Sequence, residues 1–268
     1  MSVFGNRNID RISVIHDFPE TSDCFPGVNI RGGICYFLWE REHAGDCHVI
    51  NHKDRNILDE SVRPLREKGV TTFIRYNKAI DILKKVTSQG EPTMDKLVSS
   101  RKPFGLATNY SDYSETPTNE KHVELYKFRK NGWIQESDVE KNEEWIDAWK
   151  ILEPYASPGQ DDYPHLILSK PIIAGPGTAC TETYLVVGPF KSEKEAHNVA
   201  TYMTTKFFRF MLLLLKSAQH TTQKVYAFVP QQDFSKSWTD NELYEKYGIT
   251  KDEQAFIDTL IKPLELSD

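Results

Sequence analysis

The sequence has no apolar run that approaches the roughly 18 residues needed to cross a membrane. Its longest apolar run, residues 210–215, reads Phe-Met-Leu-Leu-Leu-Leu, which is typical of a buried helix or strand. The N-terminus has no basic start followed by a long apolar stretch, so no secretory signal is indicated. We therefore expect no membrane partner.

Cysteine is also scarce, with four residues in a chain of 268, at positions 24, 35, 47 and 180. These cysteines are too few and too scattered for a disulfide scaffold, which favours reduced thiols and a cytoplasmic location. Hydrophobic residues make up 39% and charged residues 27% of the chain, as in folded globular proteins. A chain of this length buries a real core.

An overall basic excess is missing, since the formal net charge is −6, and this argues against a protein coated for non-specific nucleic-acid binding. The average hides a pattern. Residues 53–110 carry 12 Lys and Arg against 7 Asp and Glu, and residues 166–228 carry 7 against 3. Two basic blocks separated by an acidic one would form a basic cleft if the fold joins them. The alternative is the charge variation of any chain of this length.

Motifs for three kinds of chemistry are missing or incomplete. His43, Cys47, His48 and His52 are zinc-ligand types, but their spacing matches no strong zinc signature, so surface histidines are favoured. A methyltransferase needs a glycine-rich turn after its first strand to hold S-adenosylmethionine. The one tight glycine cluster, residues 31–33, precedes a strand, and no Asn/Asp-Pro-Pro-Tyr/Phe tetrapeptide occurs.

The third chemistry is that of a nuclease. A metal-dependent nuclease of the common type needs an acidic residue and then an acidic–any–Lys triplet to hold Mg²⁺. Asp161, Asp162 and Lys170 lie near one another and Glu182 follows on an expected strand, but the triplet is absent. A Mg²⁺-dependent restriction endonuclease using Asp161, Asp162 and Glu182 is therefore the alternative function.

The pattern along the chain predicts a mixed α and β protein with a seam near residues 52–60. Alternation predicts a strand at 11–17, and a continuous apolar run predicts a strand buried on both faces at 33–39. We expect a short partner strand at 47–51, a strand at 225–229, a hairpin over 125–134 turning at Asn131-Gly132, and helices over 72–86, 142–152 and 192–216. Ser192, Thr239 and Thr250, each followed three residues later by Glu, predict helix starts.

Basic, aromatic and amide side chains interleave in several loops, a combination suited to phosphate and base contacts. The candidate DNA-contacting residues are Arg75, Tyr76, Arg101, Lys102, Asn109, Lys206 and Lys224. The plain alternative is that such charged faces are only solvated.

Several phrases of the sequence are specific enough to indicate a family. They are Asp17-Phe-Pro-Glu-Thr-Ser-Asp-Cys-Phe-Pro-Gly-Val-Asn-Ile-Arg-Gly-Gly-Ile-Cys-Tyr-Phe-Leu-Trp39, Phe73-Ile-Arg-Tyr-Asn-Lys-Ala-Ile80, Ser100-Arg-Lys-Pro-Phe-Gly105, Thr181-Glu-Thr-Tyr-Leu-Val-Val-Gly-Pro-Phe190 and Gln232-Asp-Phe-Ser-Lys-Ser-Trp-Thr-Asp240. The chain resembles the C-terminal part of adenine-specific DNA methyltransferases of type II restriction–modification systems.

The resemblance implies an α+β protein in two parts. Residues 1–55 would be the last strands of a Rossmann-like methyltransferase catalytic domain. Residues 56–268 would be a mixed α/β DNA target-recognition domain, similar in its final helices to the specificity subunits of type I restriction systems. The implied function is sequence-specific recognition of double-stranded DNA, which directs N6-adenine methylation.

In such enzymes an aromatic residue before a proline stacks on the flipped adenine. Phe25 and Pro26 match that position; the alternative is that Phe25 fills the core. The family's cofactor and catalytic motifs are absent from this sequence, so S-adenosylmethionine is expected only for the complete enzyme. A remnant of two or three strands would expose an apolar edge at Ile34 to Trp39. We expect a methyltransferase catalytic polypeptide or self-association to cover it, and little activity from the chain alone.

Overall fold

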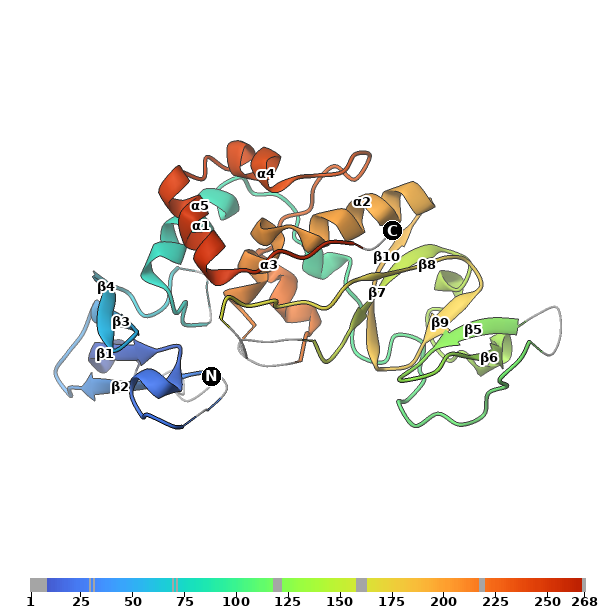
Figure 1. Cartoon of the computed structure of the whole chain (residues 1–268), viewed down its shortest axis with the longest axis horizontal. Helices are drawn as coiled ribbons and strands as arrows, with labels where there is room; N and C mark the ends of the chain where they lie inside the picture. The colour runs from blue at the N-terminus through green and yellow to red at the C-terminus, as the bar shows by residue number, and fades with distance from the viewer. Residues whose placement is uncertain are drawn as a thin grey trace. The chain divides into compact units, whose positions relative to one another are not determined.

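The computed structural model describes residues 9–28, 30, 32–68, 70, 72–117, 122–157, 163–216 and 220–266. The chain forms two compact units, residues 1–85 and 86–268, and each is considered by itself. Both combine strands and helices, so the expected mixed α and β class is confirmed (Figure 1).

The boundary between the compact units differs from the expected seam near residues 52–60. It falls after Lys85 because a strand at 56–63 completes the sheet of the first unit. The assignment of residues 1–55 to a catalytic domain and 56–268 to a recognition domain stays a prediction.

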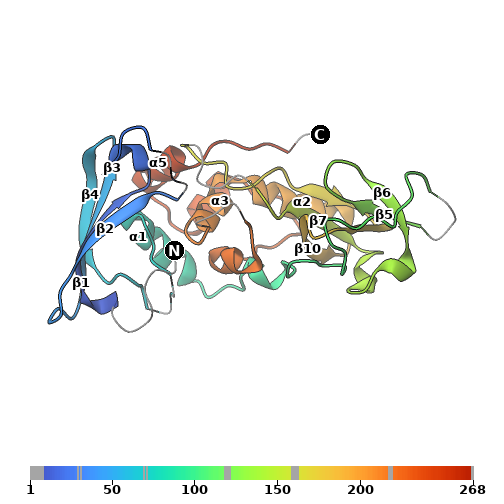
Figure 2. The ribbon, with the colours of Figure 1, turned by 90° about the horizontal axis from the view of Figure 1, so that it is seen from below.

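The first unit is built on a four-stranded sheet with the order β2-β1-β3-β4. The strands are β1 (Ile12–Phe18), β2 (Ile34–Trp39), β3 (Cys47–Lys53) and β4 (Asn56–Arg63). β1 and β3 run parallel, and the other pairs are antiparallel. The strand predicted at 11–17 is confirmed. The strand expected at 47–51 also forms, but it pairs with β1 and β4 and not with β2 (Figure 1). Figure 2 shows the same sheet from a second side.

Successive side chains of a strand point to opposite faces, and the two faces of this sheet differ. One face holds a small core of Ile9, Ile12, Ile15, Cys47, Val49 and Leu65. The other face carries rings: His16 stacks on Tyr36 with centroids 4.6 Å apart, and His52 stacks on Phe18 at 4.2 Å. Burying one face of a sheet and leaving the other open is typical of antiparallel and mixed sheets.

The expectation that residues 33–39 are buried on both faces is wrong. β2 is an edge strand, and no strand of the described chain pairs with its outer side. Tyr36 is 52% exposed and Leu38 is 51% exposed. A continuous apolar run specifies an apolar environment for a strand, but it does not show whether this chain supplies that environment.

The second unit contains two three-stranded sheets, with the orders β10-β7-β8 and β6-β5-β9. Their strands are β5 (His122–Tyr126), β6 (Gly132–Gln135), β7 (Trp149–Pro154), β8 (Ile172–Ala174), β9 (Thr178–Cys180) and β10 (Tyr184–Phe190). α2 (Glu193–Thr204) contacts all three strands of the first of these sheets. A core that includes Phe104, Leu125 and Leu152 joins the strands of both sheets.

The helices of the chain agree in part with the expectations. α1 (Asn77–Thr87) confirms the helix predicted over 72–86 but begins five residues later, and it spans the boundary between the units. The helical stretch expected at 192–216 is broken at Thr205 into α2 and α3 (Lys206–Leu213). The final helices are α4 (Asp240–Lys246) and α5 (Lys251–Leu260), and both begin with the capping boxes expected at Thr239 and Thr250.

Two local predictions for the second unit are wrong, and a third is right except for the position of its turn. Residues 142–152 form a short 3₁₀ turn followed by β7 and not a helix, and residues 225–229 lie mostly in a 3₁₀ helix, Gln223–Phe228. The hairpin over 125–134 exists, but its turn spans residues 127–131, with Gly132 already in β6. In each case pairing or packing with distant segments outweighs the local pattern.

No helix in the described part of the chain is long and apolar enough to cross a membrane. All four cysteines are free. The cytoplasmic location stays a prediction.

Candidate nucleic-acid interface

Three planar side chains form a stack at the surface of the second unit. The Arg101 guanidinium lies 4.9 Å from the centre of the Tyr155 ring, and the His220 ring stacks on Tyr155 with centroids 4.8 Å apart. The Arg101 side chain is 56% exposed, and His220 is exposed as well. Stacked guanidinium and aromatic planes of this kind are surfaces on which nucleobases stack.

Glu182 fixes the position of Arg101. Its carboxylate accepts a hydrogen bond from the Thr108 amide at 3.2 Å and pairs with Arg101 Nε, also at 3.2 Å. Its own amide donates to the Leu106 carbonyl at 2.9 Å. The Glu182 carboxylate neutralises part of the Arg101 charge and holds the guanidinium plane in place. The stack is therefore better suited to stacking on a base than to attracting a phosphate.

The backbone around Tyr155 is held from both sides. Its amide donates to the Thr183 carbonyl and its carbonyl accepts from the Thr221 amide, both at 2.8 Å. An antiparallel bridge between Ala156 and His220 also joins the segments that contain Tyr155 and Thr221. These bonds bring together residues that are 65 positions apart in the sequence, which is why the stack could not be found from spacing.

A buried polar cluster lies next to this backbone. Lys216 Nζ donates to Ser157 Oγ and to the Ile167 carbonyl, both at 2.5 Å, and Ser157 Oγ lies 2.8 Å from Thr221 Oγ1. Glu153 is fully buried, and this burial raises the pKa of its carboxyl well above the ordinary value, although Lys216 opposes the shift. The raised pKa favours the neutral form of the Glu153 carboxyl. Because the cluster is buried, it supports the stack and is not an exposed reactive group.

The loop that begins at Arg101 presents the other two residues predicted there. Lys102 is half-buried with a φ of +64°, and Asn109 is exposed. Arg101, Lys102 and Asn109 are thus carried by one loop, as the sequence indicated.

The two lysines predicted farther along differ from each other. Lys224 is exposed in the 3₁₀ helix Gln223–Phe228. Lys206, by contrast, pairs with Asp258 at 2.5 Å and is only 26% exposed. Lys206 therefore ties α3 to α5, and its availability to phosphate is reduced.

The structure does not present Arg75 and Tyr76 as a DNA-contacting surface, because Arg75 is paired within the first unit and Tyr76 is buried. Their contact with DNA stays a prediction. Arg75 Nε pairs with the buried Asp17 at 3.0 Å, and its guanidinium also donates to the Gly32 carbonyl at 2.5 Å. Tyr76 is only 4% exposed. The basic–aromatic pattern is real, but the Arg75 side chain holds the turn before β2 against the segment before α1. Burial outweighs the attraction of Arg75 and raises the pKa of Asp17 to about 6.

Phe25 and Pro26 lie in an exposed turn of the first unit. The Phe25 amide donates to the Thr21 carbonyl at 2.8 Å, and the ring is 55% exposed. The alternative that Phe25 fills the core is therefore excluded. Stacking on a flipped adenine stays a prediction.

The glycine cluster before β2 does not fit a cofactor cradle. A Cβ on Gly33 would lie 2.3 Å from the Phe18 carbonyl oxygen and 2.7 Å from the Pro19 carbonyl oxygen. The space that the missing side chain leaves is already filled by this chain's own backbone. We therefore assign no S-adenosylmethionine contact to Gly33.

The candidate metal ligands do not converge. Cys47 is buried in the core, His48 pairs with Glu60 at 3.1 Å, and His43 faces the Asp46 carbonyl. Within the described ranges no group of three or more metal-binding side chains occurs. Asp161 and Asp162 lie outside the described residues, so the nuclease alternative stays a hypothesis, with Glu182 engaged as above.

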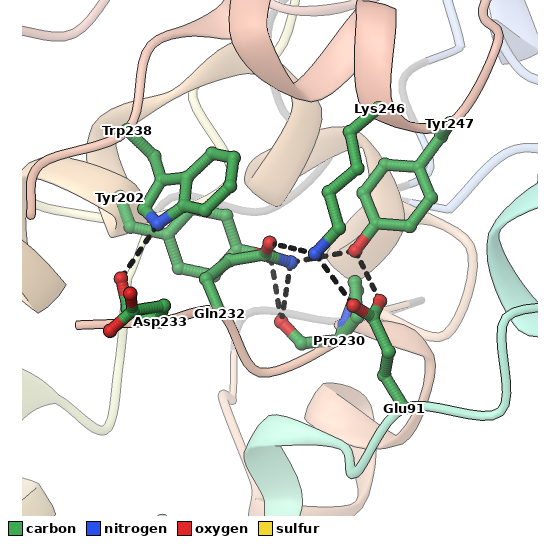
Figure 3. A network of polar contacts seen from close by, with 8 residues as sticks. All are labelled: Glu91, Tyr202, Pro230, Gln232, Asp233, Trp238, Lys246 and Tyr247. Carbon is green, nitrogen blue, oxygen red and sulfur yellow. Dashed lines mark hydrogen bonds and ion pairs between the residues drawn. The ribbon is translucent and has the colours of Figure 1, made fainter. Parts of the chain in front are cut away.

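The phrase at 232–240 that contributed to the family resemblance has a structural role. Gln232 receives a hydrogen bond from Lys246 Nζ at 2.6 Å and donates one to the Tyr247 hydroxyl at 2.7 Å (Figure 3). The Glu91 carboxylate accepts hydrogen bonds from Lys246 Nζ and from the Tyr247 hydroxyl. The Trp238 indole donates to the Asp233 carbonyl at 2.9 Å. These bonds lock α4 to the segment before it.

Comparison with known proteins gives a partial relationship. No family model matches the chain. Over 108 residues it is 32% identical to a Mycoplasma pneumoniae (strain ATCC 29342 / M129 / Subtype 1) protein described as an uncharacterized adenine-specific methylase. That match covers 37% of this chain and 25% of the relative, so the chain spans about a quarter of the relative's length.

Among solved structures, the chain is similar to the type IIG restriction endonuclease BpuSI, with 9% identity and a TM-score of 0.37. The match covers 90% of this chain and 39% of that chain. Similarity of this size defines no shared fold. The resemblance to adenine-specific methylases is thus confirmed for part of the chain, and its extension to a target-recognition domain stays a prediction.

Proposed function

We propose that the chain is the sequence-specific DNA-recognition part of a restriction–modification system, directing N6-adenine methylation of DNA. The observation that carries the proposal is the stack of Arg101, Tyr155 and His220, in which Arg101 and His220 are exposed and whose planes suit nucleobases. The partial similarity to an adenine-specific methylase supplies the link to adenine modification.

The charged residues around the stack divide into two roles under this proposal. Lys102 and Lys224 contact phosphates, which positions the protein without reading sequence. Asn109 is the residue type that pairs with adenine through two hydrogen bonds in the major groove. The basic block at 53–110 thus contributes through the loop after Arg101, while Arg75 in the same block serves the fold.

The methyl transfer itself belongs to the catalytic part of the complete enzyme. We propose S-adenosylmethionine as the methyl donor of that enzyme. Phe25, exposed and followed by Pro26, would stack on the adenine when it leaves the duplex.

A selection experiment tests the recognition role. The full chain is incubated with a pool of duplexes of random sequence, and bound duplexes are recovered, amplified and sequenced over several rounds. We expect one short motif containing adenine to be enriched. Recovery of unenriched sequences at every round would contradict the proposal.

The apolar surface of the first unit has a proposed partner. Besides Phe25, Val28 and Ile30 in the turn region before β2, its exposed large apolar residues lie on the two edge strands: Tyr36, Phe37, Leu38, Trp39, Ile57, Leu58 and Val62. An open apolar edge is a template for strand pairing. We propose that a methyltransferase catalytic polypeptide covers β2, a second copy of the chain being the other occupant.

Sedimentation velocity combined with hydrogen exchange separates the two occupants. For a catalytic polypeptide, we expect the chain alone to be a monomer in which the outward amides of β2 exchange without protection. For a second copy, we expect a dimer whose β2 amides are protected, and Leu38→Glu would remove that protection. A monomer with fully protected β2 amides would contradict both.

A further inference from the structure

The turn between β5 and β6 combines an aromatic ring with a cluster of positive charge. Residues 127–131 read Lys-Phe-Arg-Lys-Asn, so three of five side chains are cationic. Phe128 is 58% exposed, and it is the one exposed large apolar side chain among the described residues of the second unit. We call residues 127–131 the hairpin tip.

The stem below the hairpin tip is firmly held. Ser114 and Trp133 exchange two backbone hydrogen bonds, at 2.8 and 2.9 Å, which adds a segment to the free side of β6. Tyr113 packs so closely that a Cβ on Gly132 would lie 2.2 Å from its ring. On the other side, β5 pairs with β9. The tip is therefore presented on a stem paired along both strands.

The cations of the tip are held at different strengths. Lys127 Nζ lies 3.5 Å from the centre of the Tyr113 ring and donates to the Tyr110 carbonyl, so it strengthens the stem. Arg129 has a φ of +74°, and its guanidinium lies 5.1 Å from the centre of the Phe128 ring. Lys130 pairs with Glu115 at 2.9 Å, but both side chains are more than half exposed, and such pairs are weak.

A single exposed ring flanked by cations is suited to binding a polyanion that also has planar apolar surfaces. Nucleic acid has both, as phosphates and as base faces. A membrane surface would instead favour several neighbouring apolar side chains. We propose that the hairpin tip is a second DNA contact, in which Phe128 inserts at a base step and Arg129 and Lys130 contact the flanking phosphates.

This inference rests on the proposed function, because it assumes that the chain binds DNA. The test uses the full chain and a mixed-sequence duplex at low salt, with affinity measured by fluorescence anisotropy. We expect Phe128→Ala to weaken binding about 5- to 100-fold, the range for loss of one stacked base. We expect the double variant Arg129→Ala, Lys130→Ala to weaken it and to lower the salt dependence by up to about two ions.

Two further variants sharpen the result. Lys194→Ala, which removes an exposed charge on α2, is the matched control and is expected to bind like wild type. Phe128→Trp keeps the ring, should retain affinity, and its added fluorescence should be quenched when the duplex binds.

The outcomes are distinguishable. A wild-type chain that binds no duplex overturns the proposed function. Wild-type binding with tip variants equal to Lys194→Ala overturns only the hairpin contact, as does an unquenched Phe128→Trp. Tip variants that lose binding to anionic phospholipid vesicles, with duplex binding unchanged, would assign the tip to membranes and likewise overturn it.

Discussion

Replacing Gly33 with alanine is expected to destabilise the sheet of the first unit strongly. The new Cβ would lie 2.3 Å from the Phe18 carbonyl oxygen and 2.9 Å from Pro19 Cα, and both are backbone atoms that cannot rotate away. The residue also has a φ of +68°, where a side chain adds strain. Conformational strain and overpacking together predict a loss on the order of 3–5 kcal/mol.

The measurement is denaturant unfolding combined with hydrogen exchange of peptides from β1 to β4. Gly27→Ala is the matched control, because Gly27 has a φ of +80° but a Cβ added there would meet nothing within 4 Å. It should lose only about 1 kcal/mol. Equal losses for the two variants would contradict the expected clash at Gly33.

Replacing Tyr155 with alanine is expected to weaken binding of the recognised duplex about 5- to 100-fold, as for the loss of one aromatic stacking surface. The ring contacts both Arg101 and His220, so its removal takes away the surface on which both neighbours pack. The loss should fall mainly on affinity, because the backbone bonds to Thr183 and Thr221 do not involve the side chain.

Affinity is measured by anisotropy at a fixed salt concentration. Tyr155→Phe keeps the ring and should bind nearly as well as wild type, because the stack is made by the ring face. Arg101→Lys keeps the charge but loses the planar guanidinium, and should fall between the two. If Tyr155→Ala bound with wild-type affinity, the stack would not be part of the DNA interface.

The elements that can be predicted from the sequence are those whose local pattern agrees with their final environment. β1 follows from alternation, and α4 and α5 follow from Thr239 and Thr250 with their partner glutamates, since capping is a local interaction. β7 could not be predicted in this way. Trp145, Ile146 and Trp149 have helical spacing, but pairing of residues 149–154 with β8 and β10 decides the structure.

The candidate site could be predicted only where loop composition is informative. Arg101, Lys102 and Asn109 do share one loop, but exposure cannot be read from residue type, so the sequence pattern also points to Arg75 and Tyr76, which are paired or buried. No local sequence pattern around Tyr155 or His220 predicts that the two rings stack. The tip at 127–131 is a visible basic run, but it is hidden in the average of an acidic block.

The affinity ratio between the selected duplex and a scrambled duplex of the same composition tests the central claim most directly. It is measured with the full chain at physiological salt, because non-specific binding depends strongly on salt. Sequence-specific recognition predicts a ratio of about 10³ or more, and a loss of about 1–3 kcal/mol when the adenine of the motif is replaced. A ratio near one would contradict sequence-specific recognition.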